Sequence, residues 1–273
     1  PWPPKVGIPA GGGVLPRLLV DACRSEGRDF HVVAFRGHAQ AEAIAGAPQD
    51  WVRLGAVADT LRALRAAGAE ELVFAGRIAR PSLTELRPDW RAARFIAHIG
   101  GRLLSDNSLL EAIVAEFEQE GFRVVGPADV AASLLAHAGP NGRLRPTPGE
   151  VAAIALGLGA ARRHGLDDRG QAAVVQGDQV LGLEGPDGTD RLIEGCAPRQ
   201  RDGHGAILVK ARKPQQQMRA DPPVIGVATV RRAAAARYRG IAIEAGGVLV
   251  MDAPMIATVA DDAEMFVIGI EGL

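Results

Sequence analysis

Residues Val174–Asp190 read VVQGDQVLGLEGPDGTD. Two short apolar runs flank Gly177-Asp178, an arrangement typical of two antiparallel strands joined by a two-residue turn. The second run ends in a segment of glycine, proline and aspartate, which we expect to be a loop carrying the polar side chains of Asp187, Thr189 and Asp190. The stretch therefore predicts a β-hairpin whose far end presents charged and hydroxyl groups.

The first half of the chain alternates between strand-like and helix-like segments. Strands are expected at Lys5–Ile8, Phe30–Phe35, Glu71–Ala75 and Arg123–Val125, with helices between them. Alternation of this kind predicts parallel strands joined by crossover helices, the doubly wound α/β class.

The second half is richer in strands, beginning after a helix for which Thr147 and Glu150 form an expected capping box. Between the two halves, the interval 138–147 has the glycine, proline and asparagine content of a loop. We therefore expect an N-terminal Rossmann-like domain at 1–137, a linker at 138–147 and a C-terminal α/β domain with a mixed sheet at 148–273.

The composition excludes several classes of protein. The chain has 31 basic and 32 acidic residues, which argues against a general nucleic-acid binder. Its two cysteines, Cys23 and Cys196, form no Cys-x-x-Cys pair, so we expect small core hydrophobes in a reducing cytoplasm. No apolar run approaches the length of a membrane span.

A glycine turn, Gly11-Gly12-Gly13, lies between the first expected strand and the first expected helix. Glycines let a phosphate approach the backbone, and a helix N-terminus offers N–H donors to it. The turn is not a dinucleotide fingerprint, because Pro16 stands where a third small residue is required and Arg36 where an acidic residue is expected. It either binds an anionic ligand or serves packing alone.

Basic residues follow two of the expected strands. Arg77 comes after the third strand, and Lys210, Arg212 and Lys213 come after Ala206–Val209. Ligands of open parallel sheets bind outside the carboxyl ends of the strands. Three crowded positive charges repel one another unless an anion lies nearby, so this run predicts a phosphate site. The alternatives are a solvated loop for the run and a solvated strand end for Arg77.

Asp221 precedes Pro222 and Pro223, which stiffen the chain and restrict the direction of the carboxylate. Carboxylate oxygens, without a cysteine pair or closely spaced histidines, favour Mg²⁺ over zinc. Asp221 is therefore a candidate functional carboxylate in a magnesium and phosphate site. The alternative is an Asx turn, in which the side chain bonds its own backbone.

The segment Trp90–Leu104 carries Arg91, Arg94, His98 and Arg102 at helical spacing, with apolar residues on another face. A basic amphipathic helix can lie on an anionic membrane surface. A core helix with a solvated basic face is the other interpretation.

The chain resembles the UDP-2,3-diacylglucosamine pyrophosphatases of lipid A biosynthesis, in the branch built on a formerly uncharacterised bacterial domain family rather than the metallophosphoesterase branch. The resemblance covers nearly the whole chain and rests on the number and order of short matching segments. These are Ala10–Gly13, Gly76-Arg77, Leu86–Trp90, Gly121–Gly126, Glu184-Gly185, Gly188–Asp190, Leu208–Lys210, Asp221–Pro223, Ile225-Gly226 and Gly240–Gly247. The family usually has Asp-Leu-Pro where this chain has Asp221-Pro222-Pro223.

The resemblance implies a two-domain, Mg²⁺-dependent hydrolase that splits the pyrophosphate of UDP-2,3-diacylglucosamine. Water attacks the α-phosphorus, and the products are UMP and 2,3-diacylglucosamine 1-phosphate (lipid X). Such an enzyme would be cytoplasmic, with possible peripheral contact at the inner membrane where its lipid substrate lies.

The resemblance also completes the set of expected site residues. The expected catalytic residues are Asp221, Lys210, Asp190 and Glu184, with Asp221 and Asp190 as metal ligands. The expected substrate-binding residues are Gly11, Gly12, Gly13, Arg77, Gly188, Thr189, Lys213 and Glu244.

Two other classes of function stay open. A non-catalytic sugar-nucleotide or lipid sensor would bind the same ligand without turnover. A nicotinamide oxidoreductase is favoured only by the α/β order and disfavoured by the failed fingerprint at Gly11–Gly13.

Overall fold

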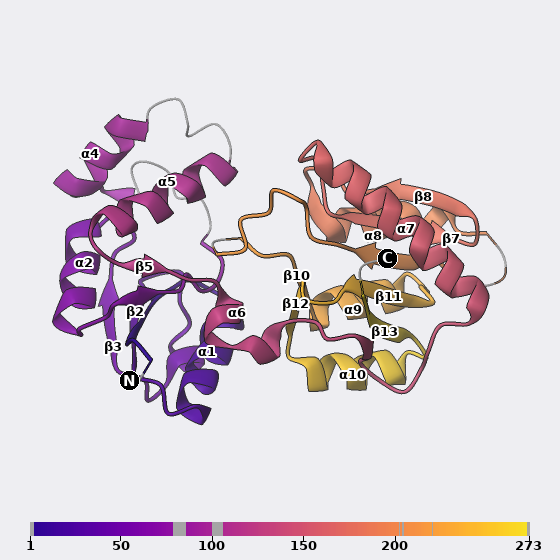
Figure 1. Ribbon diagram of the computed structural model, residues 1–273, viewed down its shortest axis with the longest axis horizontal. Helices are drawn as coiled ribbons and strands as arrows, with labels where there is room; N and C mark the ends of the chain where they lie inside the picture. Colours follow the sequence, from indigo (N-terminus) through magenta and orange to yellow (C-terminus); the bar gives the residue numbers. More distant parts are fainter. Residues whose placement is uncertain are drawn as a thin grey trace. The chain divides into compact units, whose positions relative to one another are not determined.

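The computed structural model describes residues 3–78, 86–99, 106–201, 203, 205–219 and 221–271. The chain divides into two compact units (Figure 1). Unit 1 comprises Pro1–Ala132 and Gln217–Asp221, and unit 2 comprises Ser133–Gln216 and Pro222–Leu273. The short segment Gln217–Asp221 thus belongs to unit 1, although the chain on both sides of it belongs to unit 2. The boundaries 1–137, 138–147 and 148–273 stay a prediction.

Unit 1 is built on a five-stranded sheet in the order β3-β2-β1-β4-β5, and every paired strand is parallel. This arrangement confirms the α/β class expected for the first half of the chain. The strands are β1 (Val6–Ala10), β2 (Phe30–Phe35), β3 (Gln49–Val52), β4 (Glu71–Leu72) and β5 (Arg123–Val124). The helices include α1 (Leu15–Ser25), η1 (Ala41–Ile44), α2 (Val57–Ala66), α4 (Trp90–Ile99), α5 (Asp106–Gln119) and α6 (Pro127–Val130). The short helix η3 (Ala132–Leu134) spans the boundary in sequence between unit 1 and unit 2.

The centre of this sheet is covered on both faces. All five residues of β1 are buried, as expected of a parallel strand between helices. Gly7 leaves room for the neighbouring layer, because a Cβ there would lie 2.5 Å from a methyl carbon of Leu64 and 2.6 Å from one of Leu72. Leu61 and Leu64 of α2 pack with Leu72 in one core cluster. The central strand β1 is therefore enclosed in the core of unit 1.

Unit 2 contains a mixed six-stranded sheet in the order β6-β13-β11-β9-β7-β8. Strands β13, β11 and β9 are parallel, whereas β7 and β8 form the predicted antiparallel hairpin. A second, parallel pair consists of β10 and β12. The strands are β6 (Gly139–Pro140), β7 (Ala172–Gln176), β8 (Gln179–Leu183), β9 (Ile207–Lys210), β10 (Val224–Gly226), β11 (Gly240–Glu244), β12 (Leu249–Met251) and β13 (Phe266–Ile270).

Helices cover both faces of the larger sheet (Figure 1). They are α7 (Pro148–Leu166), α8 (Gly188–Cys196), η4 (Ala197–Arg199), α9 (Val227–Ala235) and α10 (Ala253–Asp262). Side chains alternate across the strands: Val209 packs with α7 on one face, while Leu208 packs with α8, α9 and α10 on the other. Unit 2 is therefore a three-layer α/β/α arrangement, with a mixed sheet as predicted.

The long helix α7 begins at the predicted capping box. Thr147 Oγ1 accepts a hydrogen bond from the Glu150 N–H, and the Glu150 carboxylate accepts one from the Thr147 N–H. Arg239 Nε also donates to Glu150, at 2.7 Å. Burial alone would raise the pKa of Glu150, but the hydrogen bonds from Thr147 and Arg239 outweigh it and lower the pKa below its usual value of 4.5.

Some local features differ from those expected. Gly188, Thr189 and Asp190 form the first turn of α8 instead of a loop, because Gly188 adopts a positive φ of 82° at the entry and the following residues have a buried apolar face. Lys210 is the last residue of β9, not the first residue after it.

The interval 138–147 contains β6, which pairs with β13 in the sheet of unit 2. Its glycine and proline content is compatible with a short edge strand, which requires few backbone donors. Along this interval, Gly139 and Pro140 therefore belong to the folded part of unit 2.

The two cysteines match the expectation of core hydrophobes. Both Cys23 and Cys196 are buried free thiols. Burial raises the pKa of Cys23 to about 11 and also raises the pKa of Cys196, so neither is a reactive thiolate at neutral pH. No helix in the described part of the chain is long and apolar enough to cross a membrane.

Candidate active site

A buried lysine lies at the carboxyl end of β9. Lys210 is only 6% exposed, and its Nζ donates hydrogen bonds to Thr189 Oγ1 and to the Val224 carbonyl oxygen, each at 3.0 Å. Burying an ammonium group is costly unless it is hydrogen-bonded and its charge is balanced. The solvated-loop alternative for Lys210 is therefore wrong, because the side chain points into the protein.

Thr189 connects this cation to a buried carboxylate. Its hydroxyl donates to Glu184 Oε1 while its oxygen accepts from Lys210. Glu184 is 5% exposed, and its other oxygen accepts a hydrogen bond from the Gln171 N–H at 2.7 Å. We call Glu184, Thr189 and Lys210 the polar relay, because a single hydroxyl links a carboxylate to an ammonium group.

The relay is assembled from three elements that lie far apart in sequence. Glu184 directly follows β8, Thr189 lies in the first turn of α8, and Lys210 ends β9. The backbone of Glu184 is also held, since a His164 ring nitrogen lies 2.7 Å from its carbonyl oxygen. Gly170 leaves room for this backbone, where a Cβ would collide with the Glu184 carbonyl. Glu184 is thus held in the relay through both its backbone and its side chain.

Glu244 and Lys213 have partners that shape the segment after β9. Glu244 accepts from Arg162 Nη2 and from the Arg212 N–H, both at 2.7 Å. Lys213 Nζ donates to Asp168 Oδ1 at 2.6 Å. Both residues lie in unit 2, but these contacts are compatible with a structural role, and ligand binding by Glu244 and Lys213 stays a prediction.

Asp190 lies on the solvent side of α8. Its side chain is 55% exposed and is 3.3 Å from Arg232 Nη2, which belongs to an arginine that also pairs with Glu194. An arginine this close competes with a metal ion for the carboxylate. Gly188, its neighbour at the helix entry, supplies the backbone conformation that starts the helix.

The glycine turn of unit 1 lies against Arg77. The Gly11 N–H donates to the Ala75 carbonyl at 2.7 Å, and Gly12 and Arg77 exchange two backbone hydrogen bonds at 2.8 Å. A Cβ on Gly11 would lie 2.5 Å from the Arg77 carbonyl oxygen. Gly11 and Gly12 are thus needed for packing, and their N–H groups already have acceptors. Gly13 has a φ of +95°, a conformation that favours glycine.

Asp221 belongs to the segment of unit 1 that the C-terminal half of the chain contributes. Its side chain is exposed, and its N–H donates to the Gln217 carbonyl at 2.8 Å. The next residues return to unit 2, where Val224 begins β10. Only Pro222 and Pro223 separate Asp221 from Val224, so the covalent chain limits their Cα–Cα distance to about 11 Å.

The described residues do not form a ready-made metal site. Among them, no three histidine, cysteine, aspartate or glutamate side chains gather closely enough to hold an ion. Asp190 is paired with Arg232, and Asp190 and Asp221 belong to different units. An all-protein Mg²⁺ cage is therefore not present in this part of the chain, whereas a Mg²⁺ ion held by one carboxylate and substrate phosphates needs no such cage.

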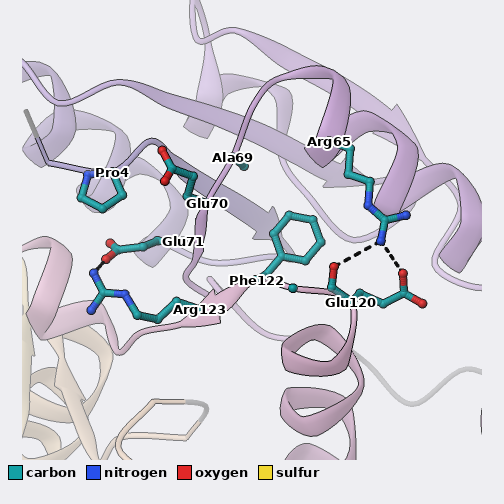
Figure 2. Close-up of a pocket in the computed structure, with 9 residues that line it drawn as sticks. Pro4, Arg65, Ala69, Glu70, Glu71, Glu120, Phe122 and Arg123 are labelled. Carbon is teal, nitrogen blue, oxygen red and sulfur yellow. Dashed lines mark hydrogen bonds and ion pairs between the residues drawn. The ribbon is translucent and has the colours of Figure 1, made fainter.

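An open cavity of about 400 Å³ in unit 1 lies where β1, β4 and β5 begin (Figure 2). Two of the glutamates that line it, Glu71 and Glu120, are each paired with two arginines. Glu71 pairs with Arg28 and Arg123, and Glu120 pairs with Arg65 and Arg91. These arginines outweigh the effect of burial and lower the pKa of Glu120. We interpret this cavity as a structural feature, since ligands of such sheets bind at the opposite, carboxyl ends of the strands.

Sequence reasoning missed several residues that build the relay. His164 and Gln171 hold Glu184, and Val224 accepts from Lys210 through its backbone. Each of these three contacts uses a backbone atom on one side, and backbone atoms leave no signature in the sequence. The short spacing between Glu184 and Thr189 was the one available signal.

Together the two units define a two-domain α/β protein with a buried cationic site at the strand ends of its second unit. Family models described as the LpxI N-terminal domain and the LpxI C-terminal domain match residues 5–134 and 137–268. The chain belongs to the LpxI family.

A curated relative supports the same assignment. The UDP-2,3-diacylglucosamine pyrophosphatase LpxI of Caulobacter vibrioides is 37% identical over 274 residues, which cover 98% of each chain. A solved structure, the glycinamide-RNase-transformylase T of Mycobacterium tuberculosis, matches with a TM-score of 0.25 and 14% identity over 66% of this chain and 44% of that chain. That likeness is too distant to support an argument.

Proposed function

We propose that this protein hydrolyses the pyrophosphate bond of UDP-2,3-diacylglucosamine in lipid A biosynthesis, giving UMP and 2,3-diacylglucosamine 1-phosphate. Its full-length similarity to the Caulobacter pyrophosphatase supports the substrate and reaction. The structural observation that carries the proposal is the buried Lys210 hydrogen-bonded to Thr189 in the first turn of α8. A lysine charge and a helix N-terminus both favour a phosphate group at the same place.

In this proposal the relay binds and orients the pyrophosphate. Lys210 offsets negative charge that develops on the phosphoryl oxygens, and Glu184 fixes the Thr189 hydroxyl so that its oxygen stays directed at the lysine. Because the relay is already hydrogen-bonded, it needs little reorganisation when the substrate arrives. Gly188 gives Thr189 its place in the first turn of the helix.

Asp221 is the proposed acceptor of the proton from water. The water oxygen forms a bond to the α-phosphorus while the bond from that phosphorus to the bridging oxygen breaks. The electron pair of the broken bond stays on the leaving lipid phosphate, and one water proton passes to the Asp221 carboxylate. Chain connectivity through Pro222 and Pro223 keeps Asp221 close to Val224, whose carbonyl oxygen accepts from Lys210.

We also propose a requirement for Mg²⁺. The fit is partial, because the described residues supply single carboxylates and not a cage. Asp221 is the leading ligand, and Asp190 could join it only by leaving Arg232. When bound with the substrate, a Mg²⁺ ion would offset charge on the pyrophosphate.

The remaining proposed substrate contacts lie in the glycine turn of unit 1 and in or beside the segment after β9. In unit 1, Gly13 and Arg77 are exposed beside the buried Gly11 and the half-buried Gly12, and this turn is the proposed substrate contact. Lys213 and Glu244 would act mainly by holding the segment that follows Lys210.

The lipid substrate also requires contact with a membrane or detergent surface. We propose that the protein works at the cytoplasmic face of the inner membrane and that α4 contributes to this contact. Trp90 on α4 is 64% exposed, and Arg94 is exposed on the same helix. Exposed tryptophan and arginine side chains suit the interface of an anionic membrane.

Product analysis tests the reaction directly. The protein is incubated with UDP-2,3-diacylglucosamine in water enriched in ¹⁸O, with Mg²⁺ or with a chelator, and UMP and lipid X are analysed by mass spectrometry. We expect turnover with Mg²⁺ and the label in UMP. Label in lipid X would contradict attack at the α-phosphorus alone, equal turnover with chelator would contradict the metal requirement, and binding without turnover would show a sensor instead of an enzyme.

A further inference from the structure

The segment Gln217–Asp221 is a short strap that packs with unit 1 although its flanking residues belong to unit 2. The chain enters it after Gln216 and leaves it before Pro222. Inside the strap, the Asp221 N–H donates to the Gln217 carbonyl at 2.8 Å, so its two ends are joined by a backbone hydrogen bond. The strap is thus a closed turn that carries Asp221.

Arg219 fixes the strap to helix α5. Its Nη1 donates to Glu118 Oε1 at 2.7 Å, and the two side chains are each 41% exposed. Arg219 Nε also donates to Gln217 Oε1 at 3.4 Å, within the strap itself. A pair this exposed contributes little to folding. The ion pair instead restricts the position of the strap relative to α5.

A second contact forms at the turn between β5 and α6. A Cβ placed on Gly126 would lie 3.0 Å from the Met218 carbonyl oxygen and 3.5 Å from the Arg219 Cα. Gly126 has a φ of −81°, which any residue adopts, so the glycine is not required for its backbone conformation. An alanine there would press against the strap backbone, which would have to move by a few tenths of an ångström.

We infer that Arg219, through Glu118, and Gly126 are positioning residues, which hold the strap so that the Asp221 carboxylate meets the reacting phosphate. This inference rests on the proposed function, in which Asp221 accepts the proton from water. A carboxylate misplaced by about 1 Å can cost ~10²-fold in rate, although nothing that binds the substrate has been removed. Loss of the strap contacts therefore lowers kcat much more than it changes KM.

Activity measurements form the first arm of the test. Because an exposed ion pair contributes up to about 1 kcal/mol, Glu118→Ala and Arg219→Ala are each expected to lower kcat about threefold to fivefold while KM is unchanged. The double variant Glu118→Arg with Arg219→Glu reverses the pair and is expected to recover most of the lost kcat. Arg62→Ala is the matched control, because Arg62 and Asp59 form another exposed ion pair in unit 1 and should leave kcat unchanged.

Trypsin supplies a second arm that does not depend on activity. Arg219 is a cleavage site, and its engagement with Glu118 should protect the peptide bond that follows it. Glu118→Ala and Gly126→Ala are each expected to accelerate cleavage after Arg219 at least about fivefold, while Arg62→Ala does not, with intact mass identifying the fragments.

The two arms separate failure of this inference from failure of the proposed function. Unchanged cleavage in both Glu118→Ala and Gly126→Ala would overturn the strap contacts, whatever the activity. Faster cleavage with unchanged kcat would show a strap that does not position Asp221. A parent protein without turnover would refute the proposed function, and with it the positioning role, while the trypsin result would still decide whether the strap is held.

Discussion

Lys210 and Thr189, which are 21 residues apart in sequence, meet through a hydrogen bond of 3.0 Å between Nζ and Oγ1. The contact joins the end of β9 to the first turn of α8. It places a buried positive charge next to a helix N-terminus. The Thr189 hydroxyl in turn donates a hydrogen bond to Glu184.

Removing the lysine charge should weaken nucleotide binding. Lys210→Met retains most of the side-chain volume but cannot donate to Thr189, and we expect its affinity for UMP and UDP to fall about 10-fold or more at low salt. The loss should shrink at high salt, because screening weakens the contact in the parent protein. Calorimetric titration measures both affinities. Lys5→Met, a lysine change in unit 1, is the control, and unchanged UMP affinity of Lys210→Met at low salt would contradict the assignment.

The Thr189 hydroxyl should matter more than its methyl group. Thr189→Val removes the link between a buried carboxylate and a buried ammonium group, which should lower the free energy of unfolding by about 1–3 kcal/mol and lower turnover. Thr189→Ser keeps the hydroxyl and should recover most of both properties. Denaturant unfolding and steady-state kinetics check this prediction, and equal behaviour of the valine and serine variants would argue against the relay.

The capping box of α7 predicts a pH-dependent stability. Since the pKa of Glu150 is lowered in the folded protein, its charge contributes stability that is present above the unfolded pKa, near 4.5, and is lost as the pH falls through the lowered value. Glu150→Gln should therefore be less stable than the parent by about 1–2 kcal/mol at pH 7, with a difference that shrinks in acid. Thermal unfolding across this pH range measures it. Glu194→Gln, in a half-exposed ion pair, is the control, and a difference independent of pH would contradict the role of the charge.

Helix α4 gives a prediction with two distinguishable outcomes. If it rests on the membrane, replacing Trp90 and Arg94 with alanine should reduce binding to vesicles that contain anionic phospholipid, with turnover on detergent-dispersed substrate unchanged. If it receives the acyl chains instead, Phe95→Ser should raise KM in detergent. Vesicles of zwitterionic lipid are the control for the first outcome. Normal vesicle binding together with normal kinetics would show that α4 has a purely structural role. Arg102, which belongs to the same basic pattern in the sequence, lies outside the described residues.

The fold was predictable because local signals agreed with one another. Alternating strands and helices indicated the parallel sheet of unit 1, and Gly177-Asp178 indicated the hairpin of β7 and β8. The Thr147 and Glu150 box marked the start of α7 to the residue. Helices α8 and α10 were not predicted. The glycine, proline and aspartate residues at the start of α8 resemble loop sequence, and α10 lies in the short interval between the predicted strands β12 and β13.

The site was predictable only as a set of candidate residues. Lys210 and Glu184 were identified as candidates. Their contact through Thr189 depends on the strand order, in which β9 pairs with β7 and not with β8. Long-range strand pairing decides this order. Lys213 was expected to bind phosphate because it belongs to a crowded run of basic residues. Its partner Asp168, 45 residues away, could not be located from the sequence, and phosphate binding by Lys213 stays a prediction. Asp221 was expected within the second domain, whereas long-range packing of its strap assigns it to unit 1.

The most direct measurement is the turnover of UDP-2,3-diacylglucosamine by the parent protein and by Asp221→Ala, combined with the affinity of each for the substrate. We expect UMP release by the parent and a kcat lower by ~10²-fold or more in Asp221→Ala, with affinity changed by no more than about threefold, because the carboxylate acts in the transition state. Absence of UMP release by the parent, or an Asp221→Ala kcat within a few-fold of the parent value, would contradict this account.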